Sequence, residues 1–335
     1  MKAPFVWFGG KRRVAPEVWA ALGDVPNYIE PFAGSLAVLL GRPHDMSNGT
    51  RRAETVNDAD GFLANFWRAL AHDPEAVAHW CDWPVNEVDL FARHLWLVNT
   101  GRSRLLEGME ADPDFYDAQV AGWWVWGVNA WIGSGWCSGD GAWVDTGDGI
   151  GKRPHLGNAG QGVNRKLPHL GNAGRAGYNN MEYRPNVLGY FEELAGRLRD
   201  VRVCCGDWSR VCTSGAMSHG SRVGVFLDPP YLGDVRTADL YAVDDHTIAH
   251  AVRDWCLEHG DDPRLRIVLA GYRAEHDDLM PDTWRRHYYS ASAAYSTTES
   301  AARQDGNHAN RANEVLWFSP HCVTPDRQGE LWEAL

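Results

Sequence analysis

The sequence Val223-Gly224-Val225-Phe226-Leu227-Asp228-Pro229-Pro230-Tyr231 joins the two patterns that decide the fold. Its first five residues are apolar or glycine, which is typical of a short strand buried on both faces of a sheet. The next four residues open with an acid and contain two prolines, which stiffen the turn after the strand. Ligands of open parallel sheets bind at the carboxyl ends of the strands, so Asp228 is predicted to belong to a functional site.

Other short apolar runs along the chain resemble this strand, and helix-like stretches separate several of them. We expect strands at residues 27–30, 54–57, 201–204, 223–227, 266–270 and 314–318. We expect helices at residues 36–41, 61–71, 186–199 and 245–259. Strands that alternate with helices indicate parallel crossovers. The predicted fold class is α/β, with a Rossmann-like, doubly wound, mostly parallel sheet.

The second and third of these strands are separated by more chain than one crossover needs. We therefore predict a discontinuous core of residues 1–72 and 186–335 and an inserted lobe of residues 73–185. Within the insert, PHLGNAG at residues 154–160 recurs at residues 168–174. Two copies of so short a unit do not make a solenoid, so the repeat is interpreted as a duplicated loop.

Charge is distributed unevenly along the chain. The formal net charge is -12, which argues against a basic surface all over the protein. Between Lys152 and Arg184, however, the segment contains six basic residues and the single acid Glu182. Phosphate contact is predicted for four of the basic residues, Arg153, Arg165, Lys166 and Arg175. A surface loop with solvated charges is the equally weighted alternative.

Several classes of protein are not indicated by the sequence. The seven cysteines include no C-x-x-C pair, and their odd number favours free thiols and a cytoplasmic setting. The amino terminus lacks the apolar stretch of a secretory signal, and no run of 18 apolar residues is present. No H-E-x-x-H motif or zinc-type spacing occurs. We expect a soluble protein with no membrane and no metal.

Acidic or glycine-containing motifs follow four of the predicted strands. They are the segment 30–35 (EPFAGS), Asp58, Asp207 and Asp228. Parallel strands bring their carboxyl ends to one crevice, so these groups are expected to meet. Each acid taken alone is also compatible with ordinary turn chemistry. As a set they indicate a nucleoside-binding site.

Each of these groups suits a part of a nucleoside ligand. A glycine turn at residues 32–35 lets the backbone approach a ligand and turns helix N–H groups toward an anionic group. Asp58 is placed to accept hydrogen bonds from ribose hydroxyls, as acids at this position do in dinucleotide folds. Asp207 is placed to accept from an adenine amino group.

The Asp-Pro-Pro-Tyr motif suits chemistry on an exocyclic amino group. Such a nitrogen is a poor nucleophile because its lone pair is delocalised into the ring. The Asp228 carboxylate and the Pro229 carbonyl can accept its two hydrogens, which positions the nitrogen without a covalent intermediate. Tyr231 offers a ring that stacks on a base flipped out of a duplex.

These motifs, in this order, resemble the Dam-like (D12 class) DNA adenine N6-methyltransferases. The resemblance is found at residues 7–11 (WFGGK), 28–35 (YIEPFAGS), 57–58 (ND), 206–208 (GDW), 228–231 (DPPY) and 314–318 (EVLWF). The family commonly has glycine where this chain has Leu36. The backbone approach to the cofactor is therefore expected to differ at that residue.

The resemblance implies S-adenosyl-L-methionine as cofactor and double-stranded DNA as partner. It implies that Trp7 and Lys11 lie against the methionine part of the cofactor, with Lys11 reaching its carboxylate or the target-base pocket. The other implied cofactor residues are Glu30, Pro31, Phe32, Gly34, Ser35, Asp58 and Asp207. The implied catalytic residues are Asp228, Pro229, Pro230 and Tyr231. The insert is implied to recognise the DNA sequence; a companion restriction nuclease cannot be read from the chain.

Alternatives remain at this point. N4-methylation of cytosine uses the same amino-group geometry, although a Ser-Pro-Pro-Tyr form would favour it, and an inactive DNA-binding protein could be built on the same fold. The glycines before Lys11 lack the spacing of an ATPase phosphate loop. The tryptophans between Trp123 and Trp143 are interpreted as core of the insert more than as base-stacking platforms.

Overall fold

The computed structural model describes residues 1–5, 7, 10–43, 52–131, 136–137, 143–145, 150–152, 187–230, 245–289 and 314–324. Within these residues, a seven-stranded sheet has the order β5-β2-β1-β6-β7-β9-β8. Its strands are β1 (Asn27–Glu30), β2 (Ala53–Asp58), β5 (Val201–Cys205), β6 (Val223–Leu227), β7 (Leu265–Tyr272), β8 (Arg285–Tyr289) and β9 (Glu314–Phe318). A separate antiparallel pair is formed by β3 (Trp143–Asp145) and β4 (Ile150–Lys152).

The sheet combines a parallel centre with an antiparallel edge. Strand β1 pairs in parallel with β2 and β6, and β6 pairs in parallel with β7. Strand β9 runs antiparallel to both β7 and β8. All six strands predicted from apolar runs are confirmed. Strand β8 was missed because its sequence, RRHYY, is polar and partly exposed at the sheet edge.

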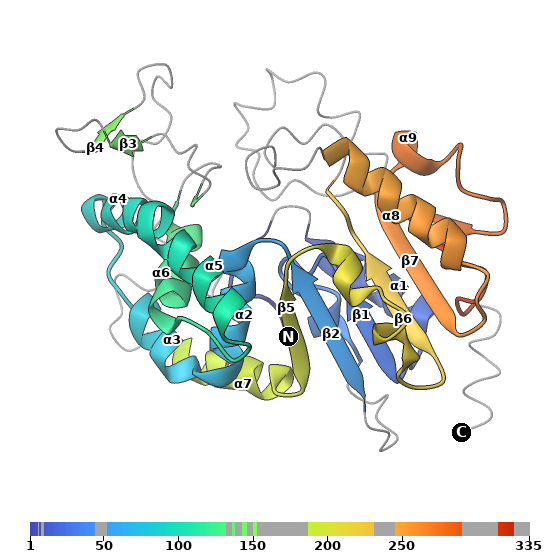
Figure 1. Ribbon diagram of the computed structural model, residues 1–335, viewed down its shortest axis with the longest axis horizontal. Coiled ribbons are helices and arrows are strands. Elements are labelled where there is room, and N and C mark those ends of the chain that lie inside the picture. Colours follow the sequence, from blue (N-terminus) through green and yellow to red (C-terminus); the bar gives the residue numbers. More distant parts are fainter. Residues whose placement is uncertain are drawn as a thin grey trace. The chain divides into compact units, whose positions relative to one another are not determined.

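Helices cover both faces of the sheet at β7. Arg266 donates a hydrogen bond to the Leu22 carbonyl at the end of α1 (Ala15–Leu22). Successive residues of a strand face opposite sides of the sheet, and Gly271 is an odd number of positions from Arg266 along β7. Gly271 therefore faces the other side of the sheet, where the nearest side chain is that of His276. On that side Arg253 of α8 (Asp245–His259) acts electrostatically on His276, and α8 contacts β7 (Figure 1). The fold is α/β, Rossmann-like and doubly wound, as predicted.

The remaining helices agree only in part with the helices predicted from the sequence. They are α2 (Gly61–His72), α3 (Pro74–Cys81), α4 (Glu87–Trp96), α5 (Arg102–Ala111), α6 (Ala118–Ala130), α7 (Val187–Leu198) and the short α9 (Arg273–His276). A π-helical turn, η4 (Leu97–Gly101), joins α4 to α5. The predictions at 61–71, 186–199 and 245–259 are confirmed. The predicted helix at 36–41 is wrong: Leu36 has a φ of 53°, and only Leu39–Gly41 forms a 3-10 turn.

Contacts divide the described chain into two compact units. The first comprises Met1–Gly10, Ala33–Leu40 and Asn57–Trp208, and the second comprises Lys11–Phe32, Gly41–Val56 and Ser209–Leu335. In the first unit, α6 packs against α2 and α3. Trp124, Trp126 and Trp131 are buried there, which confirms that these tryptophans belong to a core. The division into core and recognition lobe at residues 73 and 185 concerns function and stays a prediction.

Candidate active site

The glycine turn at Gly34, in the first unit, is held by two hydrogen bonds and packs against Trp7. Its N–H donates to Oδ2 of Asp58 at 2.9 Å, and its carbonyl accepts from Nε1 of Trp67 at 3.0 Å. Its φ is 48°, in the left-handed region that side chains disfavour. A Cβ at this position would lie 3.1 Å from the Trp7 indole. Only glycine fits this turn without strain. A glycine here is also what the sequence analysis expects, since it lets the backbone approach a ligand.

Asp58, at the end of β2, is held by backbone groups. Its Oδ2 accepts from Gly34, and its Oδ1 accepts from the Asp60 N–H at 2.9 Å. Burial, together with the Asp60 carboxylate, raises the pKa of Asp58 to about 7, although the backbone N–H groups oppose the shift. The backbone N–H groups that act on this carboxylate are those of Asp60, Gly34 and Ala59. Asp60 itself caps α2 by accepting from the N–H of Phe62 at 2.9 Å.

The end of β5 is tied to the end of β2 within the first unit. Asn57 donates from Nδ2 to the Gly206 carbonyl at 2.9 Å, and the Gly206 N–H donates to the Asp58 carbonyl at 3.1 Å. Gly206 has a φ of 138°, which turns the chain directly before Asp207. Asp207 is exposed. The backbone therefore brings the ends carrying Asp58 and Asp207 together, as the sequence predicted for parallel strand ends.

Trp7 completes this glycine-turn cluster, which we define as Trp7, Gly34, Trp67 and Asp58. Its indole is half-buried and makes an edge contact with Phe5 at 5.8 Å between ring centroids. Phe5 packs in turn on Trp67. The aromatic packing orients Trp7, while its partial exposure leaves ring surface for a ligand. Ser35, also predicted for this site, is buried next to Gly34.

A second cluster, the lysine cluster, lies in the second unit and consists of Lys11, Asp228 and Glu314. The Lys11 ammonium lies 3.0 Å from Oδ1 of Asp228 and 3.9 Å from Oε2 of Glu314. Lys11 and Glu314 are each 6% exposed. Asp228 follows β6 and Glu314 begins β9, so the topology of the sheet brings both acids to one edge. Lys11 therefore lies beside Asp228 of the Asp-Pro-Pro-Tyr motif, and the cofactor or target-base role expected for it stays a prediction.

The other residues predicted near these clusters differ in accessibility. Glu30 is 2% exposed and accepts from the Tyr28 hydroxyl at 2.9 Å. Burial, followed by the charge of Glu30, raises the pKa of Tyr28. Pro31 and Pro229 are buried, whereas Phe32 and Pro230 are half-buried. The cofactor role predicted for Glu30 stays a prediction, since its carboxylate already serves the packing of β1.

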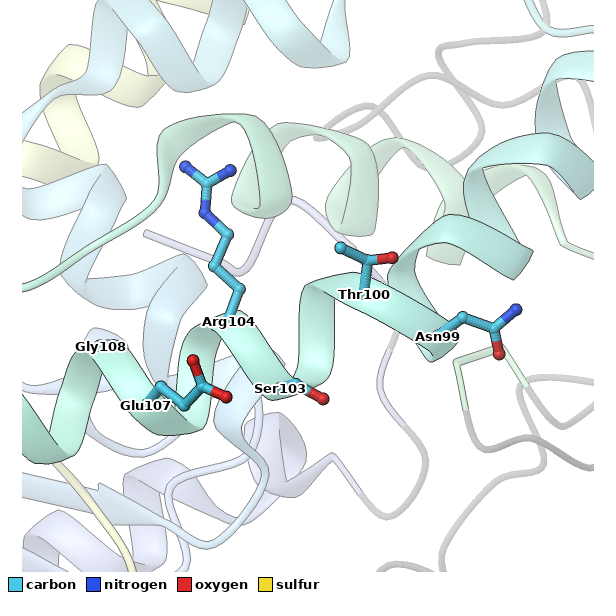
Figure 2. Close-up of a pocket in the computed structure, with 6 residues that line it drawn as sticks. All are labelled: Asn99, Thr100, Ser103, Arg104, Glu107 and Gly108. Carbon is cyan, nitrogen blue, oxygen red and sulfur yellow. The ribbon is translucent and has the colours of Figure 1, made fainter.

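An open groove of about 510 Å³ lies along η4 and α5 of the first unit. It is lined by Asn99, Thr100, Ser103, Arg104, Glu107 and Gly108, which Figure 2 shows along η4 and α5. Its one arginine and one glutamate leave it without net charge. Arg104 also forms an ion pair with Asp117 at 2.8 Å. The groove therefore has little electrostatic attraction for phosphate, and it contains no residue of either cluster.

Some predicted residues lie outside the part of the chain that the structure describes. These are Tyr231 of the Asp-Pro-Pro-Tyr motif and the basic residues Arg153, Arg165, Lys166 and Arg175. Conversely, Glu314 was not predicted as a site residue. The available signal was a charged residue at the start of a strand whose other four residues are apolar.

The doubly wound sheet and the acids at its strand ends define an α/β fold of the Rossmann-like methyltransferase type. A model of the D12 class N6 adenine-specific DNA methyltransferase family matches residues 7–86 of the chain. The resemblance found in the motifs is thereby confirmed over this span, which includes Trp7, Lys11, Gly34 and Asp58. No curated protein matches the chain. Within the described residues, no helix combines the length and apolar character needed to cross a membrane.

Proposed function

We propose that this chain transfers a methyl group from S-adenosyl-L-methionine to N6 of an adenine flipped out of duplex DNA. The observation that carries the proposal is the Lys11–Asp228 ion pair at the end of β6. Lys11 belongs to the span that matches the family model, and Asp228 opens the Asp-Pro-Pro-Tyr motif. Two parts of the family pattern that are distant in sequence are in direct contact.

The glycine-turn cluster fits a nucleoside cofactor. S-adenosylmethionine would supply a methyl group on a positively charged sulfur, from which the methyl leaves without its bonding electrons. The Asp58 carboxylate lies at the end of β2 beside the Gly34 turn, where its oxygens can accept hydrogen bonds from ribose hydroxyls. Gly34 lacks the side chain that would crowd Trp7, and Trp7 presents ring surface that attracts a sulfonium cation. Asp207 is exposed and follows the turn at Gly206, where it can accept from an adenine amino group.

Asp228 suits the target amino group. Its carboxylate accepts hydrogen bonds only, as an amino donor requires, and Lys11 holds one of its oxygens in a defined place. The amino nitrogen would form the bond to the methyl carbon, while the electrons of the broken carbon–sulfur bond would stay on the sulfur of the cofactor. The nitrogen would be positively charged until it released a proton to the Asp228 carboxylate or to water. A carboxylate beside the nitrogen stabilises that charge.

Contact with DNA is assigned to the insert of residues 73–185. The basic segment from Lys152 to Arg184 offers cations for the phosphates. The neutral groove on α5 does not offer the same attraction. Mutation of the basic segment is therefore expected to weaken DNA binding and to reduce its salt dependence.

The proposal is tested with methyl-labelled S-adenosylmethionine and unmethylated plasmid DNA. After incubation, the DNA is digested to nucleosides and the label is located by mass spectrometry. We expect the label in N6-methyladenine. Label in N4-methylcytosine would show that the target base is cytosine and not adenine. Tight binding of DNA and cofactor without any labelled product would indicate an inactive DNA-binding protein.

A further inference from the structure

Glu314 stands out among the buried acids of the second unit because its carboxylate lies near an ammonium that is already paired. Lys11 makes its shorter contact, 3.0 Å, with Asp228, and its longer one, 3.9 Å, with Glu314. The backbone of Glu314 is fixed between two strands, where it lies opposite Tyr272 of β7 and Tyr289 of β8. Its carboxylate is therefore held on rigid elements beside the Lys11–Asp228 pair.

The resting ion pair occupies Oδ1 of Asp228, one of the two carboxylate oxygens that can bind the target amino group. An amino group that binds Asp228 through Oδ1 competes with the Lys11 ammonium for that atom. In a buried environment, separating an ion pair is strongly unfavourable unless the ammonium reaches another carboxylate. Glu314 removes this obstacle. A shift of Lys11 by roughly 1 Å, estimated from 3.9 Å and an ordinary ion-pair distance near 2.8 Å, brings the ammonium to its second acceptor.

We infer that Glu314 is a positioning residue: it receives the Lys11 ammonium when the target amino group binds Asp228. The inference rests on the proposed function and adds to it an exchange of ion-pair partners. No proton is transferred in the exchange, and Lys11 remains an ammonium throughout. Glu314 itself does not touch the substrate; it acts through Lys11.

The first test compares Glu314→Gln with Glu314→Asp in single-turnover methyl transfer at saturating cofactor and plasmid DNA. Glu314→Gln is expected to lower the rate constant by about tenfold to a hundredfold, since the catalytic groups are misplaced while the fold is kept. Glu314→Asp retains the charge and is expected to recover most of the rate. Cofactor affinity should stay within about twofold in both, because the glycine-turn cluster is unchanged.

The matched control is Glu54→Gln. Glu54 is also a buried acid on a strand of the second unit, and its Oε1 accepts from Arg42 at 2.9 Å. The control is expected to lower Tm through loss of a buried ion pair but to leave the rate constant unchanged. If Glu314→Gln lowers the rate only as much as Glu54→Gln does, Glu314 has a structural role alone and the inference is overturned.

A double-mutant cycle tests whether Glu314 acts through Lys11. In a Lys11→Gln background there is no ammonium to receive, so adding Glu314→Gln is expected to cause no further loss of rate. Additive losses would contradict the inference, since additivity is the behaviour of independent sites. If the wild-type protein transfers no methyl group, the proposed function fails as well. If it does transfer methyl and Glu314→Gln is fully active, only the positioning role fails.

Discussion

Two aspartates at the ends of parallel strands have carboxylates that are held by different kinds of group. Asp58 is the last residue of β2, and Asp228 directly follows β6. Asp58 accepts hydrogen bonds from the backbone N–H groups of Gly34 and Asp60. Asp228 is held by the side-chain ammonium of Lys11. Backbone donors are fixed by the fold, whereas an ammonium on a flexible side chain can move to another acceptor. The first arrangement suits a permanent binding site, and the second suits a group that changes partner during a reaction.

The largest expected effect comes from removing the aspartate of the lysine cluster. Asp228→Ala is expected to lower methyl transfer by about 10³-fold or more, because the target nitrogen loses its acceptor and the stabilisation of its positive charge. Quenched single-turnover assays with labelled cofactor measure this loss. The melting temperature provides the control for folding. Activity close to that of the wild type would mean that Asp228 only ends a strand.

The aspartate of the glycine-turn cluster is expected to affect binding. Asp58→Ala removes the acceptor for the Gly34 N–H and the acceptors for ribose, and should weaken cofactor affinity about tenfold to a hundredfold. Calorimetric titration of the cofactor measures the change. The affinity for DNA alone should not change. A variant that binds cofactor normally would show that Asp58 only closes the turn.

A pH titration tests whether the Asp58 carboxylate binds the cofactor. The pKa of Asp58 is raised from 3.8 to about 7, so the carboxyl is protonated below that pH and accepts ribose hydroxyls well only above it. Cofactor affinity is expected to rise about tenfold between about pH 6 and about pH 8 as the carboxylate forms. Asp58→Asn should bind more weakly at high pH and show a flat profile. The same rise in Asp58→Asn would assign the titration to another group.

The smallest effect concerns the turn next to Gly34. Leu36 is fully buried but has a φ of 53°, a conformation that costs a side-chain-bearing residue roughly 1–2 kcal/mol. Leu36→Ala and Leu36→Gly both lose the buried side chain, but only glycine relieves the backbone. Leu36→Gly is therefore expected to be more stable than Leu36→Ala by about 1 kcal/mol, the reverse of the usual order. Urea denaturation of the two variants measures the free energy of unfolding of each and shows which variant is more stable.

Much of the sheet was predictable because its strands are short, apolar and flanked by helices. The six predicted strands include β2, β6 and β9, whose ends carry the acids of both clusters. Strand β8 was not predictable in this way, since an edge strand with polar residues has no apolar run. The helix expected at 36–41 failed because tertiary packing buries Leu36 in a left-handed turn, against its local preference.

The partners of the site residues were less predictable than the residues themselves. The sequence places Asp58, Asp207 and Asp228 at strand ends because periodicity reveals where strands stop. It does not reveal that Asp58 is held by backbone while Asp228 is held by Lys11. Glu314 is the first residue of β9, and the antiparallel pairing of β9 with β7 brings it near Lys11. Such contacts depend on topology rather than on spacing.

The most direct test of this division of roles is to measure two quantities on one variant, Asp228→Asn. Cofactor affinity is determined by calorimetry, and the transfer of labelled methyl to N6 of adenine is followed in a single turnover. We predict cofactor affinity within about twofold of the wild type, because the proposed cofactor contacts are made by the glycine-turn cluster, together with transfer lowered by at least about 10²-fold. Loss of cofactor binding with transfer retained at saturating cofactor would contradict the assignment of Asp228 to the target base.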